Sequence, residues 1–100
     1  MKALIDSWAL RLGVDDWDIR TEKIKPEQIE YNGEKYFVGV ERNYEDRKAV
    51  IYHDIPLDEE SIVHELLHIA FPQAEDEDYD DYEKFIAKIT KDTLFLHYLN

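Results

Sequence analysis

The chain contains no cysteine among its 100 residues. This absence excludes disulfide bonds, and it also excludes thiolate ligands for a zinc ion. A metal ion bound by this chain must therefore be held by histidine, aspartate or glutamate. The sequence supplies four histidines and 24 acidic residues that could serve in this way.

Long apolar runs are also absent from the sequence. The first segment, MKALIDSWALRLG, carries Asp6 and Arg11 within its apolar part, so it lacks the continuous apolar core of a signal peptide. No other stretch approaches the length of a membrane span. These absences predict a cytoplasmic protein that has no membrane partner.

Positive charge is scarce in this chain. Twelve lysines and arginines stand against 24 acidic residues, which gives a formal net charge of −12. Such a surface repels nucleic-acid phosphates and anionic lipids, so we expect neither class of partner. A basic protein or peptide remains compatible with this charge.

The length of the chain allows one hydrophobic core and is too short for two. With 44% hydrophobic residues the chain can bury enough apolar surface to fold. The sequence shows no internal repeat and no long linker. We therefore predict that residues 1–100 form one domain.

The spacing of the apolar residues predicts an α+β fold. Residues 2–12 place apolar side chains at helical intervals and predict an N-terminal helix. Alternating, aromatic or β-branched segments predict strands at 17–24, 36–41 and 48–53. A polar stretch separates the last two of these strands. We expect a small, mostly antiparallel sheet of three to four strands, the fourth lying near 29–31.

Residues 64–68 read HELLH and carry the strongest chemical signal in the chain. On a helix, His64 and His68 lie one turn apart on the same face, so both imidazoles can reach one metal ion. Glu65 is rotated by about 100° from His64, and its carboxylate can take a proton from metal-bound water. This pattern predicts two zinc ligands and a general base in one short segment.

Helix signals flank this motif on both sides. Asp58 can cap the first turn, and Glu59 and Glu60 suit the positive end of the helix dipole. Pro72 prevents continuation, so the helix is expected to end near Phe71. The motif should therefore lie within one continuous amphipathic helix.

A catalytic zinc site needs a third protein ligand and one open position. A second helix is predicted from Tyr79 onward, with Tyr82, Ile86, Ile89 and Leu96 as its apolar stripe. Glu83 begins a neighbouring row that contains no other acid, and we favour it as the third ligand. Asp80 and His97 are the alternatives.

Taken together, HELLHI and the later segment YEKFIAKI resemble the gluzincin branch of the zincin metallopeptidases. The small size resembles the minigluzincins, and the order of elements also resembles the ImmA/IrrE-type peptidase domains. The resemblance covers mainly residues 48–89. Metzincins are excluded, because Phe71 and Ala74 stand where that family has a glycine and a third histidine.

The resemblance implies a minimal zincin-like domain that binds one zinc ion (Zn²⁺) and cleaves peptide bonds in a peptide or protein substrate. His64, His68 and Glu83 would be the ligands, and Glu65 would be the catalytic general base and acid. The strand at 48–53 would be the edge strand that binds substrate in extended form.

The sequence allows several alternatives for two features of the expected enzyme. The oxyanion could be assisted by Tyr52, His53, Tyr82 or His97, and the sequence does not choose among them. The final segment, 94–100, could also block the cleft of so small a scaffold and keep the enzyme latent.

Two further hypotheses explain the sequence without catalysis. A chain with this many carboxylates could act as a DNA mimic or as an inhibitor that occupies a basic protein, in which case HELLH is coincidental. Zinc could alternatively be a structural ion, although structural zinc usually has four protein ligands.

Overall fold

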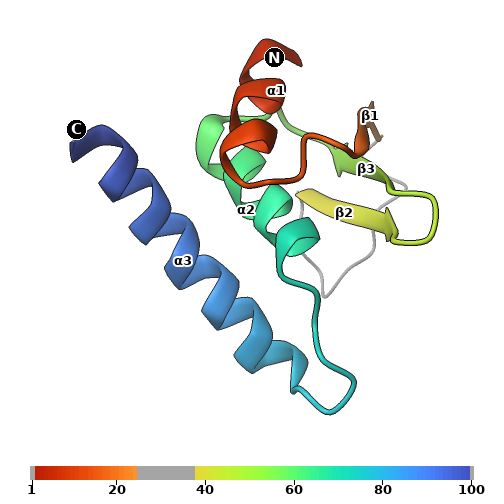
Figure 1. Ribbon diagram of the computed structural model, residues 1–100, viewed down its shortest axis with the longest axis vertical. Helices are drawn as coiled ribbons and strands as arrows, with labels where there is room; N and C mark the ends of the chain where they lie inside the picture. The colour runs from red at the N-terminus through yellow and green to blue at the C-terminus, as the bar shows by residue number, and fades with distance from the viewer. Residues whose placement is uncertain (1, 25–37, 100) are drawn as a thin grey trace.

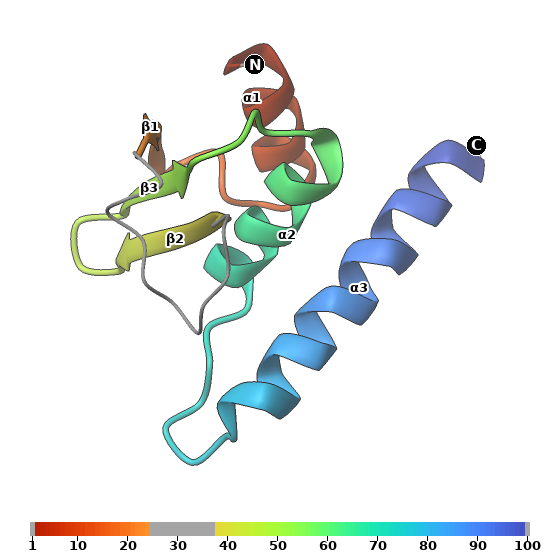
Figure 2. The same cartoon turned by 180° about the vertical axis from the view of Figure 1, so that it is seen from behind.

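The computed structural model describes residues 2–24 and 38–99, and it shows a small α+β domain in which α2 lies between α3 and a sheet (Figures 1 and 2). The described elements are α1 (Lys2–Arg11), β1 (Asp18–Lys23), β2 (Val38–Asn43), β3 (Lys48–His53), α2 (Glu59–Ala70) and α3 (Tyr79–Leu99). Within the described ranges, no helix is both long enough and apolar enough to cross a membrane.

Helix α1 ends within one residue of its predicted end. The amide of Leu12 still donates to the carbonyl of Trp8, and Gly13 then adopts a φ of 75°. Glycine reaches this left-handed conformation without the steric cost that a Cβ would add. The indole Nε1 of Trp8 donates to the carboxylate of Glu59 at 2.9 Å, which connects α1 to the first turn of α2.

The three described strands form a mixed sheet in the order β1-β3-β2. Strand β3 pairs antiparallel with β2 and parallel with β1. The prediction of a mostly antiparallel sheet was therefore wrong for these strands. The connection at 44–47 is short, so β2 and β3 form a hairpin. Strand β1 then pairs with the remaining side of β3, which runs in the same direction as β1.

This order also corrects the predicted substrate strand. Because β3 has a neighbour on each side, it is the central strand and not an edge strand. Among the described strands, β2 is the edge strand beside α2, and it approaches that helix at Val38 and Arg42. The predicted segment at 29–31 and the first two residues of the strand predicted at 36–41 lie outside the described residues.

Helix α2 forms the centre of the hydrophobic core. Its inward face packs against α1, the sheet and α3. The largest side chains that are almost completely buried are Ile51, Ile62, Val63, Leu66, Leu67, Ile86 and Thr90. The motif helix is therefore held from both sides, by the sheet and by α3.

Helix α3 begins at the predicted residue, but its buried face changes along its length. Tyr82 and Ile86 are buried as expected, whereas Leu96 is 59% exposed. Farther along, the row that begins at Glu83 turns inward, and Thr90 and His97 belong to this row. Thr90 is 1% exposed, and the His97 ring packs on Trp8 with the ring centroids 4.7 Å apart. An α-helix drifts by about 20° for every seven residues, so a stripe chosen near its start does not stay buried to its end.

Candidate metal centre

Capping at both ends fixes the position of the motif helix. The Asp58 side chain accepts a hydrogen bond from the Ser61 amide at 2.7 Å, which is the predicted N-cap. At the other end, the Arg42 guanidinium donates to the His68 carbonyl at 2.7 Å. The Tyr44 hydroxyl lies 3.1 Å from the carbonyl of Ile69. These contacts satisfy carbonyls that the last turn of a helix leaves without a partner.

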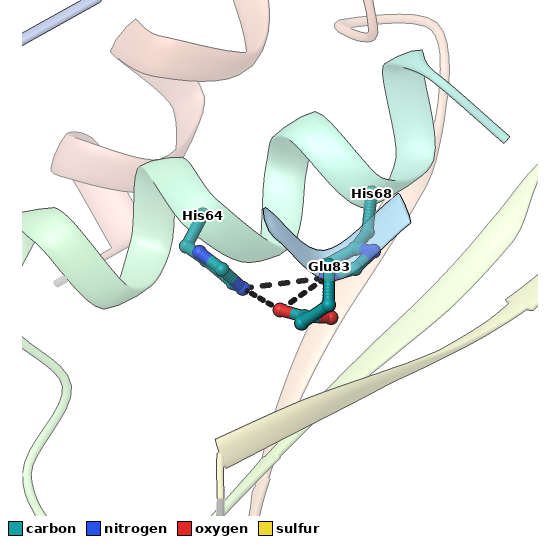
Figure 3. A group of neighbouring side chains, drawn as sticks. All are labelled: His64, His68 and Glu83. Carbon is teal, nitrogen blue, oxygen red and sulfur yellow. Dashed lines mark hydrogen bonds and ion pairs between the residues drawn. The ribbon is translucent and has the colours of Figure 1, made fainter. Parts of the chain in front are cut away.

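The structure brings the three predicted metal ligands together (Figure 3). His64 and His68 point from α2 toward Glu83, which projects from the start of α3. The Nε2 atom of His64 lies 2.5 Å from Glu83 Oε1, and that of His68 lies 3.1 Å from Glu83 Oε2. The two Nε2 atoms are 3.3 Å apart. All the candidate ligand atoms lie within 4.8 Å of one another.

The chemistry of these donors fits a metal ion. Two imidazoles and one carboxylate are the donor set that leaves a position open on a tetrahedral metal. The carboxylate of Glu83 is half-buried and His68 is buried, so water cannot fully surround the cluster. This group could therefore hold one metal ion between the two helices.

The alternative ligands lie elsewhere in the structure. Asp80 is exposed, and its amide donates to the side chain of Asp78 at the start of α3. His97 lies against Trp8 of α1. The described contacts thus place Glu83, and neither alternative, beside the two histidines.

Glu83 and Asp80 provide a matched test of the third ligand. We expect Glu83→Ala to weaken zinc binding by roughly 100-fold or more, because loss of a direct ligand should exceed the 10- to 100-fold cost of losing an outer partner. Asp80→Ala removes the same charge from the same helix and should leave affinity unchanged. Competition with a chromophoric chelator measures both. Equal zinc affinities in the two variants would exclude Glu83 as the third ligand.

His68 has surroundings that favour its neutral form. Burial lowers the pKa of His68, and the nearby Glu83 carboxylate opposes this effect. Neutral imidazole is the form that binds a metal ion. The Nδ1 atom of His68 lies 3.1 Å from the Tyr82 hydroxyl, so the remaining ring nitrogen faces Glu83.

The predicted general base, Glu65, is buried next to this cluster. It is 5% exposed, and none of the described residues donates a hydrogen bond to its carboxylate. Desolvation raises the pKa of Glu65 to about 8, the negative charge of Glu83 adds to this effect, and Arg42 opposes it. A carboxyl group with a strongly raised pKa beside a pocket is a frequent mark of a functional site.

Burial of Glu65 predicts a pH-dependent stability of the metal-free protein. The carboxyl ionises near its ordinary value of 4.5 in the unfolded chain but only near 8 in the folded chain. The folded state thus binds the extra proton, and the free energy of unfolding falls as the pH rises from about 4.5 to 8. Urea denaturation in chelator should show a loss of a few kcal/mol, at about 1.4 kcal/mol per unit of pKa difference.

The Glu65→Gln variant provides the reference for this measurement. It retains the shape of the side chain but cannot ionise, so its free energy of unfolding should depend less on pH over the same interval. Parallel pH profiles for the two proteins would mean that burial of Glu65 does not destabilise the folded state.

Of the four residues considered for the oxyanion, Tyr82 contacts the cluster. The Tyr82 side chain is 2% exposed, and its hydroxyl donates to the Phe71 carbonyl at 2.6 Å. The Tyr82 hydroxyl contacts His68 Nδ1, whereas Glu83 contacts His68 Nε2, so the hydroxyl lies on the side of the ring away from Glu83. The Nδ1 of His53 contacts the Ile55 carbonyl, and the Tyr52 hydroxyl lies 3.4 Å from Glu41.

A pocket of about 270 Å³ opens beside the first half of α2. It is bordered by Val38, Asp58, Glu60, Ser61, His64 and Glu65. The candidate base and one candidate ligand therefore face a space that a substrate side chain could enter.

Sequence reasoning missed the roles of Arg42, Tyr44 and Thr90 in this centre. The polar stretch predicted between the strands at 36–41 and 48–53 includes Arg42, yet Arg42 belongs to β2 and reaches the end of the motif helix. Thr90 was not predicted to take part in the site, yet its hydroxyl lies 3.4 Å from His64 Nδ1. Its signal was its position seven residues after Glu83, on the same side of the helix.

No family model, no curated protein and no solved structure matches this chain.

Proposed function

We propose that this chain is a minimal, gluzincin-like zinc peptidase. The observation that carries the proposal is the convergence of His64, His68 and Glu83 beside a buried Glu65. Two histidines and a glutamate form the ligand set of several zinc peptidases, and HExxH places the base next to the first ligand.

The residues divide the chemistry between them. A bound zinc ion would supply a Lewis acid for the peptide carbonyl and for the attacking water. Glu65 accepts a proton from that water and donates it to the amine that leaves. Glu65 must be ionised to accept the proton, and its ionised form is favoured when a positive charge lies beside the carboxylate.

Strand β2 is the surface on which an extended substrate would lie. Among the described strands it is the edge strand beside α2, and it begins at Val38, which also borders the pocket. An added peptide strand pairs through backbone hydrogen bonds, and its side chains occupy adjacent pockets. This arrangement replaces β3, the central strand, in the substrate role.

Hydrolysis of an unstructured peptide mixture tests the proposal. The purified chain is stripped with chelator, loaded with one equivalent of zinc, and incubated with peptides that are then analysed by mass spectrometry. We expect cleavage that needs zinc and stops when chelator is added. Absence of new termini with zinc fully bound would overturn the proposed activity while leaving the metal site in place.

The pocket predicts a preference for basic side chains next to the cleaved bond. Asp58 and Glu60 contribute carboxylates to its border, and none of its described lining residues is lysine or arginine. Exposed charge pairs contribute about 0.2 to 1 kcal/mol each. We therefore expect roughly a 3- to 10-fold higher kcat/KM for a peptide with lysine than for one with glutamate beside the scissile bond.

Reversing one charge inside or outside the pocket tests whether the pocket itself sets this preference. Glu60→Lys should abolish or reverse the preference, whereas Glu75→Lys makes the same change in net charge at an exposed position outside the pocket lining and should preserve it. If the two variants changed selectivity equally, the overall charge of the chain and not the pocket would set it.

A further inference from the structure

Two hydroxyl groups of α3 lie behind the two histidines of the metal cluster. The Tyr82 oxygen is 3.1 Å from His68 Nδ1, and the Thr90 oxygen is 3.4 Å from His64 Nδ1. Both residues are buried, at 2% and 1% exposure. Each histidine therefore has one ring nitrogen against a hydroxyl of α3 and the other turned toward Glu83.

Each of the two hydroxyls donates its proton to a backbone carbonyl. Tyr82 donates to the Phe71 carbonyl at 2.6 Å, and Thr90 donates to the Ile86 carbonyl at 2.7 Å. A hydroxyl has one proton to donate and two lone pairs that accept. Arg42 donates to the Tyr82 oxygen at 3.3 Å, which agrees with its role as an acceptor. Toward the histidines, both oxygens are therefore acceptors.

This direction of donation determines where the histidine protons lie. A neutral imidazole that donates from Nδ1 carries its lone pair on Nε2. The Nε2 atoms of His64 and His68 are 3.3 Å apart and both face the Glu83 carboxylate. Lone pairs of three side chains thus converge on one point, where only a cation or an added proton can satisfy them.

We propose that Tyr82 and Thr90 are positioning residues that set the Nδ1–H form of both histidines before a metal ion binds. Helix α3 would then supply one ligand directly, through Glu83, and orient the other two through its hydroxyls. The inference rests on the metal site of the proposed function and does not depend on peptide hydrolysis. Outer partners of this kind typically change metal affinity by roughly 10- to 100-fold.

Long-range ¹H–¹⁵N correlation spectra of the metal-free, labelled protein test the inference without any substitution. Above the pH at which the rings are charged, His64 and His68 should show the Nδ1–H form. His53 and His97 provide internal references outside the cluster. A dominant Nε2–H form at His64 and His68 would overturn the proposal.

Substitutions of Thr90 then distinguish the effect of its hydroxyl group from the effect of its packing. Thr90→Val has nearly the same shape without the hydroxyl, so His64 should shift toward the Nε2–H form and zinc affinity should fall roughly 10- to 100-fold. Thr90→Ser restores the hydroxyl and should recover both signals. Tyr82→Phe should have the corresponding effect on His68.

The outcomes distinguish this inference from the proposed function. If zinc binds but Thr90→Val changes neither the ring form of His64 nor the affinity, positioning by Thr90 is overturned while the metal site stands. If the unmodified protein binds no zinc, the proposed function fails, and the spectra of the metal-free protein still decide whether α3 sets the ring forms.

Discussion

A Glu65→Gln protein should bind zinc as tightly as the unmodified chain and hydrolyse peptides roughly 10²- to 10⁴-fold more slowly, which is the usual contribution of a general base. Glu65 lies outside the three-residue group that could hold the metal, so its loss should not remove a ligand. It is buried beside His64 and borders the pocket, so its loss should remove the group that accepts the proton.

The comparison needs a variant that loses a carboxylate elsewhere. Glu75→Gln makes the same chemical change at an exposed position outside the cluster and should retain full activity. Zinc content, folding and kcat/KM are measured for all three proteins. Normal turnover in the Glu65→Gln protein would exclude Glu65 as the base. A loss of zinc from it would mean that Glu65 contributes to the metal site.

The motif helix was predictable because its signals are local. Asp58 and Pro72 mark its ends within a residue or two, and the four-residue spacing of His64 and His68 fixes their common face. Glu83 depends on a tertiary contact, yet it stood alone as an acid at the head of its row. The spacing therefore indicated which side chains could meet, and α3 brings them together.

The sheet order and the surroundings of the histidines could not be predicted in the same way. Alternation shows which face of a strand is buried, but it does not show which strands are neighbours. The family resemblance implied that residues 48–53 form an edge strand, whereas β3 lies between β1 and β2. The contact between Arg42 and the His68 carbonyl joins residues that are 26 positions apart, and no local pattern reveals it.

The metal site and the base differ in how they affect folding. The cluster of His64, His68 and Glu83 brings together ligand atoms that could hold a metal ion, so the folded chain should be stabilised by metal. Glu65 has no donor among the described residues, so its burial should destabilise the folded chain at high pH. A catalytic arrangement explains both features, whereas a surface built only to present carboxylates would need neither.

The second large effect concerns His68, whose replacement by alanine should abolish zinc binding. Native mass spectrometry of the untagged protein should show one zinc per chain, and the His68→Ala protein should show none at one equivalent. Zinc at 100 times its Kd would stabilise the unmodified chain by about 2.7 kcal/mol. For a domain of this size that corresponds to a rise in Tm of roughly 10 to 20 °C, which the variant should lack.

His97→Ala is the matched control, because it removes an imidazole that packs on Trp8, away from the cluster. It should retain one zinc and the full rise in Tm. Zinc binding that survived the loss of His68 would place the ion elsewhere on the acidic surface. An unmodified chain that took up no zinc at neutral pH would make HELLH coincidental, and the net charge of −12 would then favour a protein that binds a basic partner.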